Sequence, residues 1–116
     1  MLLVTDSGKP FIIDVLEDVQ FIEVNREMIG AFYAYWRLCT EYNVRGVCTG
    51  AAREPEYLHE PLHLKGYAWD FRSYIFPDAQ RAAARLAEIL RYVDAKYRVV
   101  YIKPPKPVHF HVEFRR

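Results

Sequence analysis

The four histidines of this 116-residue chain lie in two short windows, and this clustering is the first sign of chemistry. His59 and His63 form one window, and His109 and His111 form the other. Asp70 follows the first window. Imidazole nitrogen and carboxylate oxygen are the ligands that Zn²⁺ takes in sites without cysteine. The cluster therefore predicts a metal site, whereas a single histidine on a strand would be expected only to be solvated.

His59 and His63 have the spacing of two ligands on one helical turn, as in the His-Glu-x-x-His motif of helical zinc peptidases. Pro61 lies between them and argues against a helix at this point. His63 combines differently with Asp70, because we expect His63 on a loop that enters a strand and Asp70 within that strand. Gly66, between the two, lets the backbone turn tightly.

Alternation along two predicted strands brings the titratable groups together, because successive side chains point to opposite faces of a sheet. In the strand Val108–Phe114 one face carries His109, His111 and Glu113. In the strand Gly66–Ile75 the corresponding face carries Ala68, Asp70 and Arg72. The opposite faces are apolar and carry Tyr67, Trp69, Phe71, Val108, Phe110, Val112 and Phe114. If the strands are neighbours, the two histidines and Asp70 converge away from the core, and Ala68 leaves open space beside Asp70.

Two segments that must support these strands carry helical signals. Asn25 is a good N-cap for a helix from Arg26 to Tyr42, and Asn43 ends that helix. Its expected buried face consists of Met28, Phe32, Tyr35 and Leu38. Pro77 suits the first turn of a second helix. The expected buried stripe of that helix consists of Ala79, Ala82, Leu86, Ile89 and Val93.

The remaining β-prone segments are short, and the mixture of strands and helices has no regular alternation. The predicted strands are Leu2–Val4, Phe11–Val15, Val19–Val24, Val44–Cys48, Gly66–Ile75, Arg98–Ile102 and Val108–Phe114. The first two form a hairpin around Asp6–Pro10, and Lys103–Pro107 must be a loop. We therefore expect one α+β domain over residues 1–116, with a small antiparallel sheet packed by two main helices and a zinc site on the open face of the sheet.

Composition limits the partners of the chain. Hydrophobic residues make up 52% and charged residues 27%, which is enough for a folded core. Sixteen basic against fifteen acidic residues give a net charge of +1, so we do not expect a nucleic-acid partner held by bulk charge. The two cysteines are too few for a disulfide scaffold or a cysteine-rich zinc site. No signal peptide or membrane-spanning segment is visible, so we expect cytoplasmic synthesis and no membrane partner.

A family resemblance rests on three motifs of this sequence. His63-Leu-Lys-Gly66-Tyr-Ala68-Trp-Asp70 resembles the His-x-x-Gly-x-Ala-x-Asp motif of the zinc D-alanyl-D-alanine carboxypeptidase family. That family includes vancomycin-resistance dipeptidases and phage L-alanyl-D-glutamate endolysins, and shares its metal site with the hedgehog signalling domain. His109-Phe-His111 resembles the closing His-x-His motif. The stretch from Val47 to Arg53 is similar to the family's Ser-Gly-Tyr-Arg stretch.

The resemblance implies one Zn²⁺ per chain, held by His63, Asp70 and His111. Three protein ligands leave a fourth position for water, which is the catalytic arrangement. Zinc lowers the pKa of such a water and polarises the scissile carbonyl. The resemblance also implies that Arg53 contacts the substrate or the developing oxyanion, and that His109 is the catalytic partner.

The base that accepts the proton of the attacking water is assigned less directly. In the Glu-x-x-His branch of the family a glutamate would stand at Val108, so this chain lacks that base. His109 is our first choice and Glu113 is the reserve. Pro61 also replaces the serine that often precedes the first ligand by two residues.

Two other functions stay open beside the expected one. The His-hydrophobe-His strand also fits rolling-circle replication nucleases, in which Tyr92 or Tyr97 would have to attack phosphate. Both tyrosines precede the histidine pair, whereas that nucleophile usually follows it. The third reading is a zinc-binding module without catalysis. The expected function is zinc-dependent hydrolysis of peptidoglycan stem peptides or related D-amino-acid peptides, by a protein released at lysis if its source is a phage.

Overall fold

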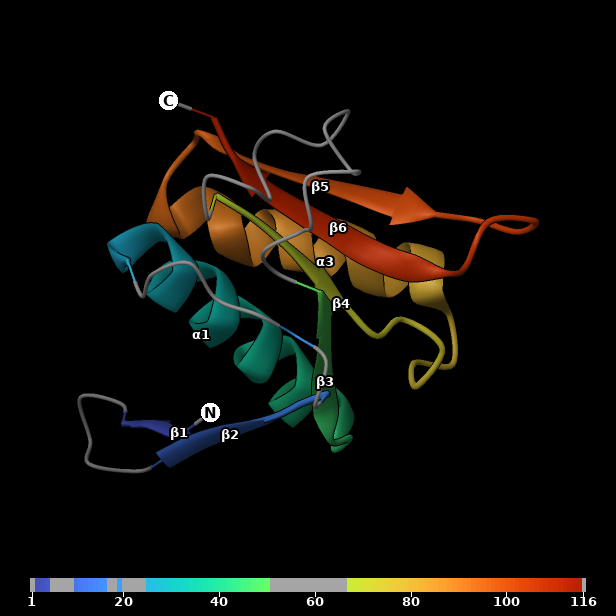
Figure 1. Ribbon diagram of the computed structural model, residues 1–116, viewed down its shortest axis with the longest axis horizontal. Coiled ribbons are helices and arrows are strands. Elements are labelled where there is room, and N and C mark those ends of the chain that lie inside the picture. Colours follow the sequence, from blue (N-terminus) through green and yellow to red (C-terminus); the bar gives the residue numbers. More distant parts are fainter. Residues whose placement is uncertain (1, 5–9, 17–18, 20–24, 51–66, 116) are drawn as a thin grey trace.

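Two helices lie against one face of a six-stranded sheet (Figure 1). The computed structural model describes residues 2–4, 10–16, 19, 25–50 and 67–115. The elements in chain order are β1 (Leu2–Val4), β2 (Pro10–Val15), α1 (Arg26–Tyr42), β3 (Gly46–Gly50), β4 (Ala68–Phe71), α3 (Ala79–Val93), β5 (Tyr97–Ile102) and β6 (His109–Phe114). The predicted α+β class, with two helices packed on a small sheet, is confirmed. Neither described helix has the length and apolar character needed to span a bilayer.

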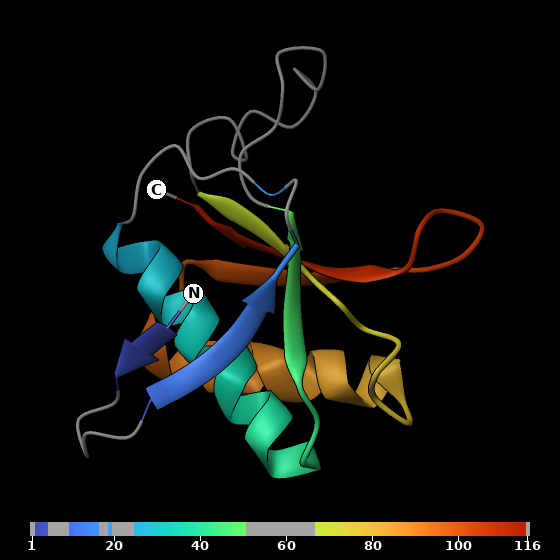
Figure 2. The same ribbon diagram turned by 60° about the horizontal axis from the view of Figure 1, so that its bottom comes forward.

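The strands are ordered β1-β2-β3-β4-β6-β5 across the sheet. All neighbouring pairs are antiparallel except β2 and β3, which run toward the same end of the sheet (Figure 2). The expectation of an antiparallel sheet is therefore wrong for this pair. Parallel neighbours need a crossover of about a dozen residues or more, and the 17-residue helix α1 connects β2 to β3.

Local capping sets the helix ends. Asn25 Oδ1 accepts a hydrogen bond of 2.7 Å from the backbone N–H three residues on, and Asn43 ends α1 in the left-handed conformation with φ 54°. Both ends of the predicted helix are confirmed. The N-cap of α3 is Asp78, so Pro77 precedes the cap instead of standing in the first turn. Val93 is 46% exposed and does not belong to the buried stripe.

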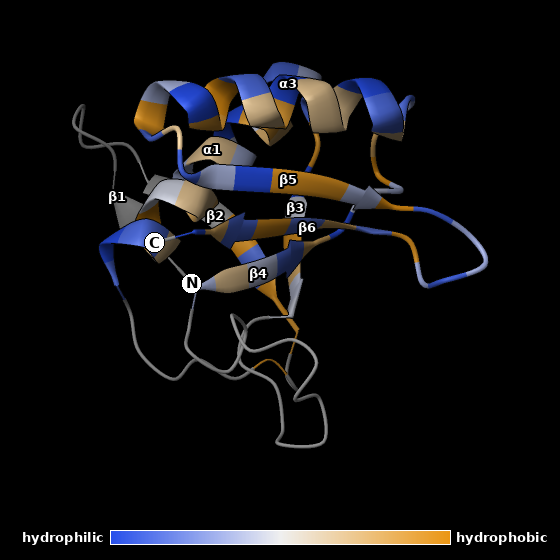
Figure 3. Ribbon diagram, turned by 90° about the horizontal axis from the view of Figure 1, so that it is seen from above, coloured by the Kyte–Doolittle hydropathy of each residue, from blue (hydrophilic) through white to orange (hydrophobic). Residues whose placement is uncertain are grey.

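The core lies between the helices and one face of the sheet, and Figure 3 shows α1 and α3 on that side. The Phe71 ring on β4 stacks on Tyr35 of α1, with centroids 4.4 Å apart, and meets Phe32 edge-on. Burial raises the pKa of each of the two cysteine thiols, Cys39 and Cys48, to about 12. These thiols therefore serve as small apolar core groups rather than as ligands or nucleophiles.

The observed strands are shifted or shorter than predicted at several ends. β4 covers only Ala68–Phe71 of the expected Gly66–Ile75, because the chain turns away after Phe71 toward α3. β3 begins at Gly46 rather than Val44. The expected strand Val19–Val24 falls almost wholly outside the described residues. Val19 itself is in no strand, and its N–H donates to the Leu16 carbonyl in a turn.

Replacing Gly46 with alanine should destabilise the protein. A Cβ atom at this position would lie 2.6 Å from Tyr35 Cε2 and 2.8 Å from Cys39 Sγ, both of which are buried. Overpacking of this kind costs about 1–3 kcal/mol. Urea unfolding followed by circular dichroism should show a lower midpoint for Gly46→Ala, and an unchanged midpoint would contradict the close packing of β3 against α1.

Candidate metal centre

Three potential metal donors meet on the face of the sheet opposite the helices. The antiparallel register places Asp70 of β4 directly opposite His111 of β6, with His109 two residues earlier on the same face. Asp70 Oδ1 lies 3.0 Å from His111 Nδ1 and 3.5 Å from His109 Nε2. One ligand atom from each residue lies within 4.8 Å of the others. The group Asp70, His109 and His111 could therefore hold a metal ion.

The ring of His109 is oriented by the loop before β6. Its Nδ1 lies 2.8 Å from the Pro107 carbonyl oxygen, which can only accept, so Nδ1–H is the donor. His109 Nε2 then faces Asp70 Oδ1, which also lies within hydrogen-bond distance of His111 Nδ1. A metal ion could be held between these donor atoms. Metal-bound histidines commonly have the other ring N–H held in this way.

Asp70 is buried, so its carboxylate needs nearby hydrogen-bond donors or cations. Its side chain is only 4% exposed, while the side chains of His109 and His111 are 23% and 19% exposed. A carboxylate so far removed from water needs compensating donors or cations to remain charged. The two imidazoles next to this carboxylate are still partly open to solvent, and all three side chains line the open cleft. The donor set thus fits a metal ion approached from the solvent side.

Glu113, the reserve candidate for the base, is engaged elsewhere. Arg115 donates to Glu113 Oε1 from Nε at 3.1 Å and from Nη2 at 2.9 Å. The other oxygen, Oε2, lies 3.8 Å from His111 Nε2. Glu113 is nearly buried and lies opposite Ala68 in the register, two residue pairs away from the pair of Asp70 and His111. Its position suits a carboxylate that flanks His111 better than one that receives a proton in the cleft.

An open cleft of about 710 Å³ adjoins the donor group. Its described lining consists of Thr49, Asp70, Arg72, Tyr74, Ile102, Lys106, Pro107, Val108, His109 and His111. Ala68 is fully buried and is absent from this described lining. The open space beside Asp70 therefore extends toward Arg72 and the loop before β6, not toward Ala68 as the sequence suggested.

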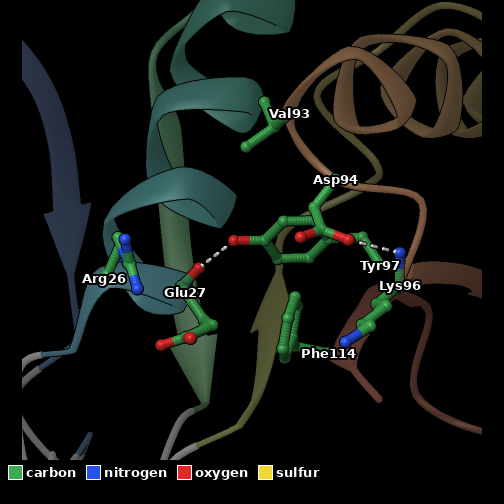
Figure 4. Close-up of a pocket in the computed structure, with 7 residues that line it drawn as sticks. All are labelled: Arg26, Glu27, Val93, Asp94, Lys96, Tyr97 and Phe114. Atoms are coloured by element: carbon green, nitrogen blue, oxygen red, sulfur yellow. Dashed lines mark hydrogen bonds between the residues drawn. The ribbon is translucent and has the colours of Figure 1, made fainter. Parts of the chain in front are cut away.

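A second cleft, of about 510 Å³, lies where α1, α3 and β5 meet (Figure 4). Tyr97 points into it and donates its hydroxyl to the Glu27 backbone carbonyl, and burial raises the pKa of that hydroxyl. Lys96 donates its backbone N–H to the Asp94 side chain. These contacts join the helix ends to the sheet, and the described lining of this cleft contains no histidine.

Two of the predicted site residues, Arg53 and His63, lie outside the described residues, as does His59, so among the described residues the structure brings together Asp70, His109 and His111. Glu60 also lies outside the described residues, and with it the segment reads His-Glu-Pro-Leu-His, which matches the letters of the His-Glu-x-x-His motif. Comparisons with protein-family models, with curated proteins and with solved structures find no match for this chain.

Loss of either central donor should lower metal binding sharply. Asp70→Ala and His111→Ala each leave two donors, which hold a transition-metal ion poorly. Elemental analysis after dialysis against a divalent transition metal should show about one ion per chain in the parent and far less in both variants. Asp14→Ala is the matched control and should keep the parent's metal content. Asp14 is an exposed carboxylate of β2 in the same sheet, and it pairs with Arg45. Full metal content in Asp70→Ala would contradict the site.

Removal of metal should leave the fold intact. The hydrophobic core lies on the helix side of the sheet and contains neither histidine nor Asp70. The protein should therefore differ from a zinc finger, which unfolds without its metal. Far-ultraviolet circular dichroism in excess chelator should retain the helix and strand signal, and its complete loss would show that metal is part of the folding energy.

Proposed function

We propose that the protein is a zinc-dependent metallopeptidase, of the carboxypeptidase or endopeptidase type, that hydrolyses peptidoglycan stem peptides or related D-amino-acid peptides. The observation that carries the proposal is the convergence of Asp70, His109 and His111 beside an open cleft. An open cleft next to a donor group suits a catalytic site, because a structural zinc site is closed by four protein ligands. The motifs described above add the peptide class of substrate.

The donor chemistry supports zinc among the available metals. Two ligand atoms bound at about 2.0–2.1 Å in a tetrahedral site lie about 3.3 Å apart. The observed separation of Asp70 Oδ1 from His111 Nδ1, the two described ligand atoms of the proposed set, is 3.0 Å and lies close to that value. Imidazole with carboxylate also favours a borderline ion over Ca²⁺ or Mg²⁺, which prefer oxygen ligands alone.

His109 is proposed as the group that accepts the proton of the attacking water. Because its Nδ1–H is held by the Pro107 carbonyl, the lone pair on Nε2 is available on the cleft side. Bound zinc would supply Lewis-acid polarisation of a carbonyl group and of a water molecule. His63 as the third ligand and Arg53 as the substrate or oxyanion contact come from the family resemblance and belong to the same proposal.

The nuclease alternative receives less support from the geometry. Tyr92 lies on α3, which packs on the opposite face of the sheet, and it is 88% exposed. Tyr97 packs toward the core and its hydroxyl is engaged by the Glu27 carbonyl. Neither hydroxyl lies on the face that carries the two histidines. The zinc-binding module without catalysis is distinguished only by measuring turnover.

Replacing His109 with alanine should lower kcat far more than it changes KM. General acid–base groups contribute about a hundredfold to ten-thousandfold, and they act mainly in the transition state. Hydrolysis of muropeptides followed by mass spectrometry should show this loss in His109→Ala, while the zinc content of the variant stays near one per chain. If Glu113→Ala abolishes activity and His109→Ala retains it, Glu113 is the base.

The zinc content of two variants decides the third ligand. We expect His63→Ala to lose zinc and His109→Ala to keep it, because Asp70 and His111 are directly opposed in the register and His109 lies two residues earlier on β6. The reverse result would make His109 the ligand and remove it as the base. Bound zinc with no hydrolysis of any peptide would identify a non-catalytic module.

A further inference from the structure

The cleft beside the candidate metal centre contains two cations that the donor group does not use. Arg72 and Lys106 both line it, and Asp70 is the single carboxylate among its described lining residues. The described lining therefore carries a net positive charge even before a divalent ion is added. A concave site of one charge sign concentrates ligands of the opposite sign.

Arg72 differs from the other half-buried arginine that the structure describes. Arg85 is held by Glu41 and Glu88 between α1 and α3. The guanidinium of Arg72 has no carboxylate or hydrogen-bond partner in the described part of the chain, and its recorded contact is the face of the Tyr74 ring, 5.0 Å away. A guanidinium offers five N–H donors in a planar fork that matches a carboxylate. The donors of Arg72 are thus available to a ligand in the cleft.

The backbone of Arg72 is fixed on both sides, one residue beyond the end of β4. Its N–H donates to the Val47 carbonyl at 2.9 Å, and its carbonyl accepts the Tyr35 hydroxyl at 2.8 Å. Tyr35 is fully buried and also accepts the Val47 N–H at 3.3 Å. Arg72 is therefore placed firmly with respect to Asp70, two residues earlier. A backbone position fixed in this way fixes the point from which the Arg72 side chain enters the cleft.

We propose that Arg72, together with Lys106 from the lining of the same cleft, binds the C-terminal carboxylate of a peptide, so that the protein acts as a carboxypeptidase rather than an endopeptidase. This inference rests on the proposed peptidase function. Ile102 and Val108 supply apolar lining for a small side chain next to that carboxylate. Two cations suit a single anionic group, whereas binding along a nucleic-acid backbone draws on many phosphate contacts.

The test compares N-acetyl-D-alanyl-D-alanine with its C-terminal amide by isothermal titration calorimetry, on both chelator-treated and zinc-loaded protein. The free acid should bind on the order of tenfold more tightly than the amide. Arg72→Gln should abolish that preference, Arg72→Lys should keep part of it, and Lys106→Gln should reduce it. Arg98→Gln is the matched control, because Arg98 is an exposed cation of β5 that is absent from the described lining, and it should leave the preference unchanged.

Equal affinity for the acid and the amide in the parent protein, or an undiminished preference in Arg72→Gln, would overturn the anchor. If the protein prefers the acid but hydrolyses no peptide, the carboxylate site at Arg72 is supported and the proposed peptidase function is wrong. If it hydrolyses acid and amide with equal kcat/KM, the peptidase function is supported and the carboxylate site is wrong. Displacement of the acid by a short single-stranded DNA, through a site that Arg72→Gln removes, would overturn the peptide assignment in favour of the nuclease.

Discussion

The antiparallel register between β4 and β6 is the constraint on which the rest of the site depends. It pairs Trp69 with Val112 on one face and Asp70 with His111 on the other. A slip of one residue would turn Asp70 into the helix-covered core and expose Trp69, which is now 1% exposed. Apolar burial on one face therefore holds the polar groups of the other face in place, although the core contains none of the candidate donors.

The two described helices cover one face of the sheet, and the candidate metal centre lies on the opposite face. Phe71 meets Phe32 and Tyr35 of α1, so β4 is anchored to the helical layer at the residue next to Asp70. The Tyr35 hydroxyl extends this anchoring to Val47 and to the backbone of Arg72. A single buried side chain thus connects α1, β3 and the end of β4, and links the core to the rim of the cleft.

Charge on the open face is distributed unevenly. Glu113 is neutralised by Arg115, and Asp14 by Arg45 farther along the sheet. Asp70 is nearly buried against two imidazoles, and Arg72 faces an aromatic ring rather than an acid. Among the described residues, Arg72 thus lines the cleft without an acid beside it, which suits a site for an anionic ligand, because an internal ion pair would compete with that ligand.

The sequence by itself determined the features that depend on neighbours in the chain. Asn25 and Asn43 mark the ends of α1 through their own side chain and backbone, and strand alternation already separated His109, His111 and Asp70 from the apolar face. Only the tertiary structure decided that β4 and β6 are neighbours, that β2 and β3 are parallel, and that Arg72 stays without an acid in the described part of the chain. Strand order and ion pairing are chosen by which long-range contacts bury the most apolar surface and satisfy the most polar groups. These contacts join residues that are far apart in the chain, so no local sequence pattern specifies them.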